Sequence, residues 1–450
     1  MKKIFSLLTL IAVTITPIAF LYAEESDSDL YTTQLRNPKA PSTNSQRTRS
    51  ASRWLLGLPG LPWDAAKAGV DPTLNYIEDS RLVKKIDWFW QEIKSRGFYP
   101  EARFAPGSFI SGAGLKIQGE TLFRTQESMP YLKYDVTGGF SKKGSNGLYR
   151  DLSTGYMLRI PNNDALYHAS RFYYNYKPLE HFYGIGHNTS LGDKTLYSEE
   201  ETKFETKGGY EITENFKAEG ILEYRHINIG NGHKEDYFRI KERFSESEVP
   251  GIHGTNLFTY GLMFNHDTRD SVEDPLSGGY EQFKMYLADD ISGDNFHYLH
   301  MKFDGARFFQ LWSDRRVLVL RLAAGRSQPI GDGKVPFFDL QRLGGYGSQP
   351  LGSEVNRAFV YNRFFDKTML VFTPEYRYNV WRYGNFGADS VFFVDIGEVF
   401  REIHSFGLDK LKPSYGWGLH VKRLRDVFFS FEVAHGNEGT KVYVRTKNAF

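Results

Sequence analysis

The sequence predicts an all-β protein that crosses a membrane as a transmembrane antiparallel β-barrel. From Phe98 onward, segments of roughly ten residues alternate apolar and polar side chains and are separated by turn signals. Aromatic residues make up 16% of the chain, which is high for a soluble protein. After residue 23 no apolar run of about 18 residues occurs, so a bundle of spanning helices is excluded. A closed barrel is the other structure that satisfies its backbone hydrogen bonds in lipid.

Composition excludes several kinds of site. The chain has no Cys, so it has no disulfide, no thiolate chemistry, no zinc site of the usual kind and no lipid-modified Cys. Its 56 basic and 54 acidic residues give a net charge of +2, and removal of Lys2 and Lys3 with the first segment would make it neutral. A nucleic-acid-binding protein would carry a clustered basic excess. We therefore expect no nucleic-acid partner.

Residues 1–23 are predicted to be a secretory signal peptide. Lys2 and Lys3 give a basic start, Ile4 to Ile15 is apolar, and Ala23 is a small residue at the expected cleavage site. A membrane anchor is the alternative. The apolar run is shorter than the roughly 20 residues that a spanning helix needs, which favours the signal peptide.

Two segments precede the strands. Residues 24–53 are polar and rich in Ser and Thr, so they predict a disordered linker. Residues 54–97 predict an amphipathic helical segment. Apolar side chains recur there at helical spacing: Leu82, Ile86, Phe89 and Ile93. Two interpretations stay open: this segment lies on the inner leaflet of the membrane or plugs the barrel, or it is a small packed element.

The strand pattern distinguishes a membrane barrel from a soluble sandwich. Residues 216–225 and 317–324 alternate so that one face suits lipid while the other face of such strands often carries charge. A β-sandwich also alternates, but it rarely has charge on so many successive strands together with so many aromatics. Residues 213–215 predict a short periplasmic hairpin, and the polar stretches 230–237 and 288–296 predict surface loops.

The last residue is Phe450. Barrels sorted to the outer membrane commonly end in an aromatic residue on an amphipathic last strand. Val442 and Val444 would share the lipid face with Phe450, whereas Thr446 and Asn448 interrupt that face. We interpret Phe450 as a sorting signal.

Four short motifs occur in order within the strand region. They are Asp267-Thr268-Arg269-Asp270 with Pro275 and Gly278-Gly279-Tyr280, then Leu343-Gly344-Gly345, then Glu375-Tyr376-Arg377-Tyr378, and then Phe393-x-Asp395-x-Gly397. In this order and spacing they resemble the bacterial surface antigen family, the BamA/TamA-type barrels of the outer-membrane protein-assembly superfamily. The resemblance covers residues 98–450. It implies a barrel of about 16 strands in the cell outer membrane of a Gram-negative-type bacterium.

The resemblance also implies a lumenal loop. Gly344 and Gly345 would enter this loop, Arg357 and Phe359 would lie at its tip, and the strand with Phe393, Asp395 and Gly397 would receive it. An unpaired buried charge is costly and guanidinium–carboxylate pairing is directional, so Asp395 is the expected partner of Arg357. Gly397 would let the loop approach the wall closely. A rim salt bridge, with both residues solvated, is the alternative.

Two departures from the family pattern affect the loop tip. Ala358 is found where the family has Gly, and it would be strained if the tip needed a positive φ. The stretch 346–356 is also longer than usual. In the first motif, Asp267, Arg269, Asp270 and Gly279 form the strand signature, and its charged members either form a lumenal cluster or only decorate a turn.

The resemblance implies a protein that inserts or translocates other proteins at the outer membrane. The loop would stabilise the barrel while a weak seam between the first and last strands admits client strands or perturbs lipid. Expected partners are outer-membrane lipid, assembly proteins of the periplasm or outer membrane, and unfolded barrel clients. No polypeptide-transport-associated domain is recognisable in residues 24–97. A passive channel or a lipid-organising barrel therefore stays an alternative.

An enzyme is not expected. The chain has no Gly-x-Ser-x-Gly elbow, no His-Glu-x-x-His and no phosphate-binding Gly loop, so we predict no catalytic residue and no cofactor. Asp289, Asp290 and Asp294 lack the ligand spacing of a calcium loop. We expect a solvated surface loop there and no metal site.

Overall fold

The computed structural model describes most of the barrel region. It covers residue 92 and residues 98–104, 110–120, 132–143, 147–160, 163–232, 237–313, 315–345, 356–383, 386–423 and 426–445. The predicted signal peptide, linker and sorting residue Phe450 lie outside the described residues, as does the helical segment apart from residue 92. Within the described part, no helix has the length and apolarity to span a membrane.

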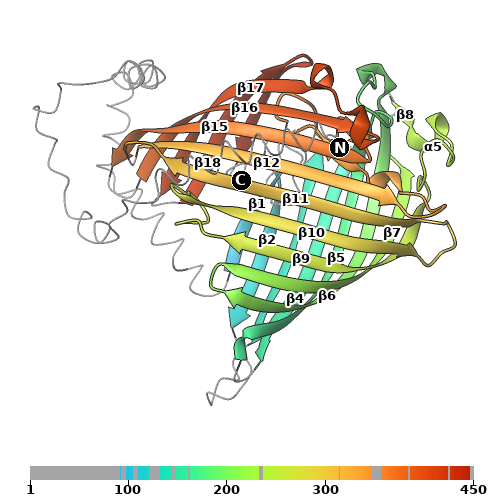
Figure 1. The fold of residues 1–450 in the computed structure, drawn as a ribbon, viewed down its shortest axis with the longest axis horizontal. Coiled ribbons are helices and arrows are strands. Elements are labelled where there is room, and N and C mark those ends of the chain that lie inside the picture. Colours follow the sequence, from blue (N-terminus) through green and yellow to red (C-terminus); the bar gives the residue numbers. More distant parts are fainter. Residues whose placement is uncertain are drawn as a thin grey trace, which may run out of the picture.

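Sixteen wall strands make one curved sheet, which Figure 1 shows wrapping around a central space. The sheet has 17 strands, of which the two-residue β8 (Phe238–Arg239) pairs in parallel with β6 and is not part of the wall. The wall strands are β1 (Phe98–Phe104), β2 (Ile110–Glu120), β3 (Leu132–Lys143), β4 (Gly147–Ile160), β5 (Asn163–Phe182), β6 (Thr195–Thr213), β7 (Phe216–Asn231), β9 (Gly254–Asp267), β10 (Gly278–Asp290), β11 (His297–Gln310), β12 (Arg316–Pro329), β15 (Thr368–Tyr383), β16 (Phe386–Phe400), β17 (Lys412–Arg423), β18 (Asp426–Gly436) and β19 (Gly439–Arg445). The predicted fold class and strand number are confirmed.

Short elements lie in the connections. They are α5 (Ile240–Arg243), the strand pair β13 (Gln341–Leu343) and β14 (Phe364–Asp366), and the 3-10 turns η3 (Leu191–Asp193), η4 (Phe337–Asp339), η5 (Ile403–Ser405) and η6 (Leu408–Lys410). The pair β13–β14 and η4 belong to one long connection between β12 and β15, residues 330–367. We call this connection the lumenal loop.

Every neighbouring pair of wall strands is antiparallel, in sequence order. Among the strand residues that the structure describes, no ladder joins β1 directly to β19. The structure describes seven residues of each of these two strands. We call the boundary between them the seam.

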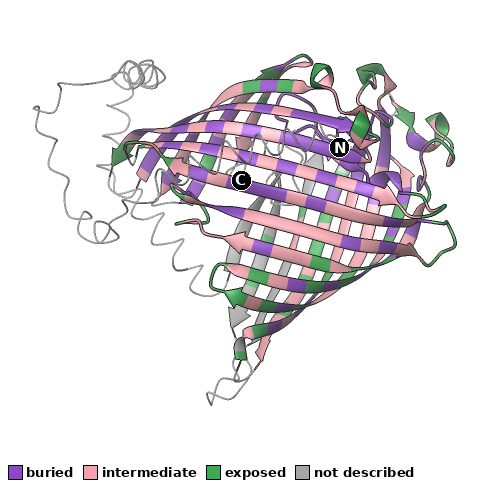
Figure 2. Ribbon diagram, viewed as in Figure 1, coloured by how far each residue is buried: buried purple, intermediate pink, exposed green. Residues whose placement is uncertain are grey.

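Alternation along the strands gives the wall two faces, as Figure 2 shows. On β7, Glu219 and Glu223 are buried toward the lumen while Leu222 and Tyr224 are exposed on the outside. A strand has a period of two residues, so each lumenal position is followed by an outer one. The outer face carries a belt of exposed apolar side chains, including Phe258, which is what contact with lipid requires.

The two rims of the barrel differ. At one rim, β6 and β7 are joined by residues 214–215 alone; we call it the short-turn rim. At the other, the long-loop rim, residues 183–194, 232–253 and 330–367 make extended connections. Apolar side chains of the strand ends and these loops form one buried core. Its members are Phe182, Tyr197, Ile227, Ile229, Ile240, Val249, Ile252, Leu257, Tyr286, Ala288, Phe296, Tyr298, Val335, Phe337, Phe338, Leu340 and Phe365.

Aromatic packing holds the lumenal loop in that core. The ring of Phe182 on β5 lies 5.3 Å from the ring of Phe337 and 5.1 Å from that of Phe365, both on the lumenal loop, in edge-on arrangements. Such offset aromatic pairs add about 0.5–1.5 kcal/mol to the burial of their area. The loop is therefore packed inside the long-loop end of the barrel.

Candidate functional site

Two glycines shape the descent of the lumenal loop. Gly344 and Gly345 have φ angles of +117° and +96°, which side-chain-bearing residues rarely adopt. A Cβ on Gly344 would lie 2.8 Å from the Cβ of Arg363, and one on Gly345 would lie 2.8 Å from the Cα of Tyr361. The two glycines let the segment that leads to the loop tip run beside the segment that leads away from it; we call these segments the legs of the loop. Backbone hydrogen bonds of 3.0 Å in both directions join Gly345 to Asn356.

The tip of the loop is buried. The Nδ2 of Asn356 donates to the backbone carbonyl of Lys412 at 2.7 Å. Phe359 packs edge-on against Phe364, with ring centroids 5.5 Å apart. Arg357 lies between Asn356 and Phe359 in the sequence, and its side chain is 0% exposed. The loop thus carries a guanidinium to a place that water does not reach.

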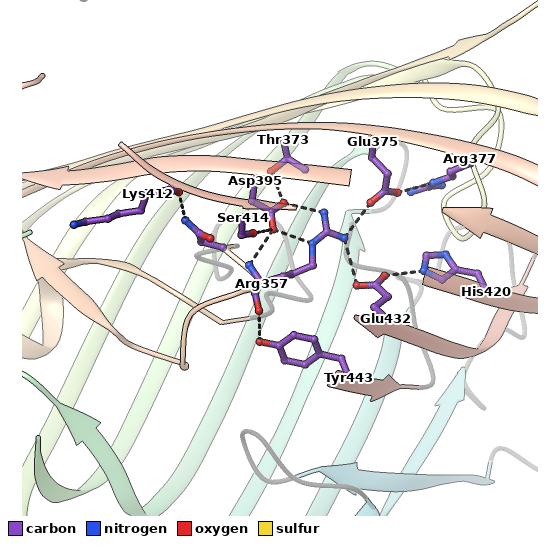
Figure 3. A network of polar contacts seen from close by, with 11 residues as sticks. Arg357, Thr373, Glu375, Arg377, Asp395, Lys412, Ser414, His420, Glu432 and Tyr443 are labelled. Carbon is purple, nitrogen blue, oxygen red and sulfur yellow. Dashed lines mark hydrogen bonds and ion pairs between the residues drawn. The ribbon is translucent and has the colours of Figure 1, made fainter. Parts of the chain in front are cut away.

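Asp395 receives this guanidinium (Figure 3). Nε of Arg357 donates to Oδ2 at 3.0 Å and Nη2 donates to Oδ1 at 2.8 Å, a bidentate pair. The backbone N–H of Arg357 also donates to Oδ2, at 2.9 Å. Thr373 and Ser414 each donate a hydroxyl to the same carboxylate at 3.1 Å. The carboxylate is therefore surrounded by donors, as a buried charge requires.

Two further carboxylates complete the site. Nη1 of Arg357 lies 3.2 Å from Oε2 of Glu375 and 3.3 Å from Oε2 of Glu432. Arg377 donates to Glu375 at 2.8 Å, and Nε2 of His420 lies 2.7 Å from Oε1 of Glu432. Two guanidinium groups thus face three carboxylates. We call these six residues the arginine cluster.

The arginine cluster joins the last five wall strands. Glu375 and Arg377 lie on β15, Asp395 on β16, His420 on β17 and Glu432 on β18. Tyr443, on β19, donates its hydroxyl to the backbone carbonyl of Arg357 at 2.7 Å. One residue of the lumenal loop is therefore bonded, directly or through one intermediary, to every strand from β15 to the seam.

Burial makes this pairing strong. Burial by itself opposes the charged guanidinium, but Asp395 and then Glu432 outweigh it and raise the pKa of Arg357 well above its ordinary range. The ring of Phe393 lies under the guanidinium, 3.3 Å from ring centroid to Cζ. Removing one partner of a buried ion pair typically costs about 3–5 kcal/mol, because the other charge stays buried.

The close approach expected at Gly397 is present. A Cβ there would lie 3.0 Å from Cδ1 of Leu343 on the lumenal loop. The strain considered for Ala358 does not occur, because its φ is not positive; Asn362, at +56°, takes the left-handed conformation instead. The Cβ of Ala358 packs at Gly436 of β18, where a Cβ would lie only 2.7 Å away. The stretch 346–355 lies outside the described residues.

The strand signature shapes the turn between β9 and β10, residues 268–277. Arg269 makes a bidentate pair with Asp267, with distances of 2.9 and 2.6 Å, and its guanidinium lies 4.7 Å from the ring centroid of Tyr280. The carboxylate of Asp270 accepts from the backbone N–H groups of residues 276 and 277. Gly279 is the second residue of β10, and its N–H donates to the hydroxyl of Thr268 at 3.1 Å. These charges organise the turn and do not join the arginine cluster.

The same turn reaches into the lumen. Asp274 is buried, and its carboxylate lies 2.6 Å from Nζ of Lys422, which also pairs with Asp389 at 2.8 Å. Arg377 lies 4.0 Å from Asp274. Because Arg377 also belongs to the arginine cluster, a continuous chain of charges runs from the loop tip to the short-turn rim.

A separate ion pair holds the part of the lumenal loop that contains η4. Arg225 on β7 pairs with Asp339 of η4 at 2.6 Å, and Tyr298 on β11 donates its hydroxyl to the same carboxylate. Burial would raise the pKa of Asp339, but the Arg225 guanidinium outweighs burial and lowers it. The carboxylate is therefore charged, and it anchors the loop to the wall opposite its tip.

Sequence reasoning missed most partners of the arginine cluster. Glu375 and Arg377 were part of a quoted motif but had no role, and Glu432, His420 and Tyr443 were not singled out. The available signal was the alternation along each strand, which places each of these polar residues at a lumenal position. The alternation alone does not indicate which loop residue these side chains contact.

The acidic residues of the β10–β11 connection shape their own loop. Oδ1 of Asp290 accepts from the hydroxyl of Thr255 at 2.7 Å and from the backbone N–H of Ser292 at 2.8 Å, and Asp294 also accepts from Thr255. In the part of the chain that the structure describes, no group of three or more metal-ligating side chains could hold a metal ion.

Comparison with known proteins gives a family and a fold. Residues 113–423 match the family model described as the Omp85 superfamily domain. The structure is similar to BamA from Haemophilus ducreyi lacking POTRA domains 1-3, with a TM-score of 0.52 and 14% identity over 77% of this chain and 67% of that chain. CdiB from Escherichia coli has a TM-score of 0.49 and 11% identity over 77% of this chain and 61% of that chain. No curated protein matches the sequence.

Packing of the loop tip predicts a rescue by a second substitution. Gly436→Ala should destabilise the barrel by about 1–3 kcal/mol, because its new methyl group would clash with that of Ala358. Adding Ala358→Gly should restore part of the loss. Urea unfolding in lipid vesicles measures both. Gly220→Ala is the control, since no atom lies within 4 Å of a Cβ there. Equal stability of Gly436→Ala and this control would contradict the packing described.

Because Asp274 is buried and Glu273 is exposed, we expect the two acids to differ in how much they stabilise the β9–β10 turn. Asp274→Asn should cost about 1.5–3 kcal/mol, the value of a hydrogen bond to a charged group, and should speed amide exchange in residues 268–277. Glu273→Gln removes the same charge from an exposed neighbour and should change neither. Unfolding and hydrogen exchange of the two variants provide the test. Identical behaviour would show that the turn is not held by Lys422.

Proposed function

Because the chain belongs to the Omp85 superfamily, we propose that it is an outer-membrane barrel that assists the insertion or translocation of proteins at that membrane. The observation that carries the proposal is the arginine cluster, which holds a lumenal loop against the five strands that lead to the seam. The short-turn rim would face the periplasm and the long-loop rim the outside. Outer-membrane lipid would contact the apolar belt.

The proposed mechanism divides the barrel into a rigid part and a weak part. The arginine cluster ties β15 to β18 together through buried charges, and the Tyr443 hydroxyl adds β19. Among the described residues, no ladder joins the two strands of the seam directly. A client strand could therefore pair with the free edge of β1 or β19, since exposed strand edges accept further strands. Cluster bonds would keep the wall intact while the seam opens.

A passive channel is the alternative that the loop argues against. An open pore needs a continuous aqueous lumen. Here the lumenal loop and the apolar core fill the long-loop end next to β5–β7 and β9–β11. Arg225, Asp339 and the Phe182 ring hold the loop from the opposite wall. A solute would have to displace buried aromatic rings and ion pairs in order to pass there.

The domain boundaries follow from this proposal. Residues 98–450 would form the outer-membrane domain, and residues 1–23 would be removed on export. Residues 24–53 would form a linker before the segment 54–97. That segment would lie at the periplasmic side of the barrel. Phe450 would act in sorting. Clients and assembly partners would meet the barrel from the periplasm.

The outer-membrane proteome with and without the protein tests the function. Depletion should selectively lower other barrels, with their precursors accumulating in the periplasm. Wild-type protein should restore them and Arg357→Met should not. Arg243→Gln, which breaks an exposed pair with Asp193, is the control and should restore them fully. An unchanged set of barrels after depletion would count against the function and favour a channel or lipid-organising role.

A further inference from the structure

A second arginine of the lumenal loop makes bonds that the arginine cluster does not explain. Arg363 lies on the leg that leads away from the tip, and it is only 2% exposed. Nε donates to Oε1 of Glu438 at 2.7 Å, Nη1 donates to the hydroxyl of Thr189 at 2.8 Å, and Nη2 donates to the Thr189 carbonyl at 2.6 Å. All three guanidinium nitrogens are engaged, at two separate places.

Those two places belong to opposite sides of the seam. Glu438 is on the hairpin between β18 and β19, the last two strands. Thr189 is on the connection between β5 and β6, residues 183–194. Along the wall, β1, β2, β3 and β4 lie between them. Arg363 therefore bonds the final hairpin to the β5–β6 connection across the seam.

The environment keeps the guanidinium in this position. The ring of Tyr183, at the start of the β5–β6 connection, lies 4.7 Å from Cζ of Arg363, and the ring of Phe364 lies 4.4 Å away. Asn362, directly before it, has a positive φ of 56° and donates its side-chain amide to Glu180 of β5 at 3.2 Å. The planar fork and the aromatic contacts fit Arg and do not fit Lys.

The loop leg also contacts the β5 side directly. The backbone N–H of Gly186, in the β5–β6 connection, donates to the carbonyl of Phe365 at 2.7 Å. The Phe365 ring packs against Phe182 of β5. The leg is thus bonded to the β5 side, and the pair between Arg363 and Glu438 joins it to the final hairpin.

We propose that Arg363 is a positioning residue that latches the β18–β19 hairpin to the β5–β6 connection and holds the seam closed at the long-loop rim. The proposal deepens the proposed function, on which it rests, by naming what must be released before the seam opens. Its role differs from that of Arg357, which pairs with carboxylates of strands on one side of the seam. Separation of β19 from β1 carries Glu438 away from Thr189 and breaks the latch.

Spin labels can measure the latch directly, since the chain has no Cys of its own. One label is attached at Leu191→Cys, in the exposed η3 turn of the β5–β6 connection, and the other at Asn437→Cys, at the exposed tip of the hairpin. The protein is reconstituted in lipid vesicles without any client. The distance distribution should be narrow for the parent protein. Glu438→Ala should broaden it and add a longer-distance population.

A matched variant and a second measurement complete the experiment. Arg243→Ala breaks an exposed pair between the β7–β9 and β5–β6 connections, on one side of the seam, and should leave the distribution narrow. Hydrogen exchange of the hairpin 436–440 should become about tenfold faster in Glu438→Ala, the change expected from one charge-assisted hydrogen bond. Arg363→Lys should behave like Glu438→Ala.

The results distinguish failure of the latch from failure of the proposed function. A folded Glu438→Ala protein, judged by its heat-resistant band, with a parental distance distribution and parental hairpin exchange would overturn the latch. If Arg363→Lys does not fold, the Glu438→Ala result decides alone. Because no client is present, loss of the latch can be observed even if the protein proves not to assemble other barrels, and a failed latch leaves the proposed function standing.

Discussion

A buried guanidinium needs carboxylates around it, and in this barrel they come from the wall strands next to the seam. Arg357 binds Asp395 in bidentate fashion and contacts Glu375 and Glu432, with Tyr443 on its backbone carbonyl. None of these groups could be buried alone without a cost of several kcal/mol. The lumenal loop and strands β15 to β19 must therefore assemble together. The outer face contributes burial in lipid, but it does not specify this arrangement.

The loop also acts as a brace between opposite walls. Asp339 binds Arg225 on β7, the Phe182 ring packs on the loop from β5, and the tip is bonded to the last five strands. Below the tip, Arg377 continues the chain of charges to Asp274 on the β9–β10 turn. A lumen crossed in this way is suited to holding a wall in shape while one edge moves. It is poorly suited to steady conduction.

Much of the fold was predictable from the sequence, because alternation has a fixed period and lipid selects one face. On β7 the expected lumenal and outer faces are those observed. The nearness of Arg357 and Asp395 was expected from short motifs. Their other partners were not, because Glu432 lies 75 residues from Arg357, and only strand register and tilt bring the two together. The chain fits Ala358 by pairing its methyl group with Gly436, which no local pattern reveals.

The most direct test of the account is a double-mutant cycle on Arg357 and Asp395, measured as free energies of unfolding in lipid vesicles. Arg357→Met and Asp395→Asn should each cost about 3–5 kcal/mol, and the double variant should cost little more than either alone, because the partners share one interaction. Single losses below about 1 kcal/mol that simply add would contradict it. The loop would then be held by apolar packing, and the arginine cluster would not organise the barrel.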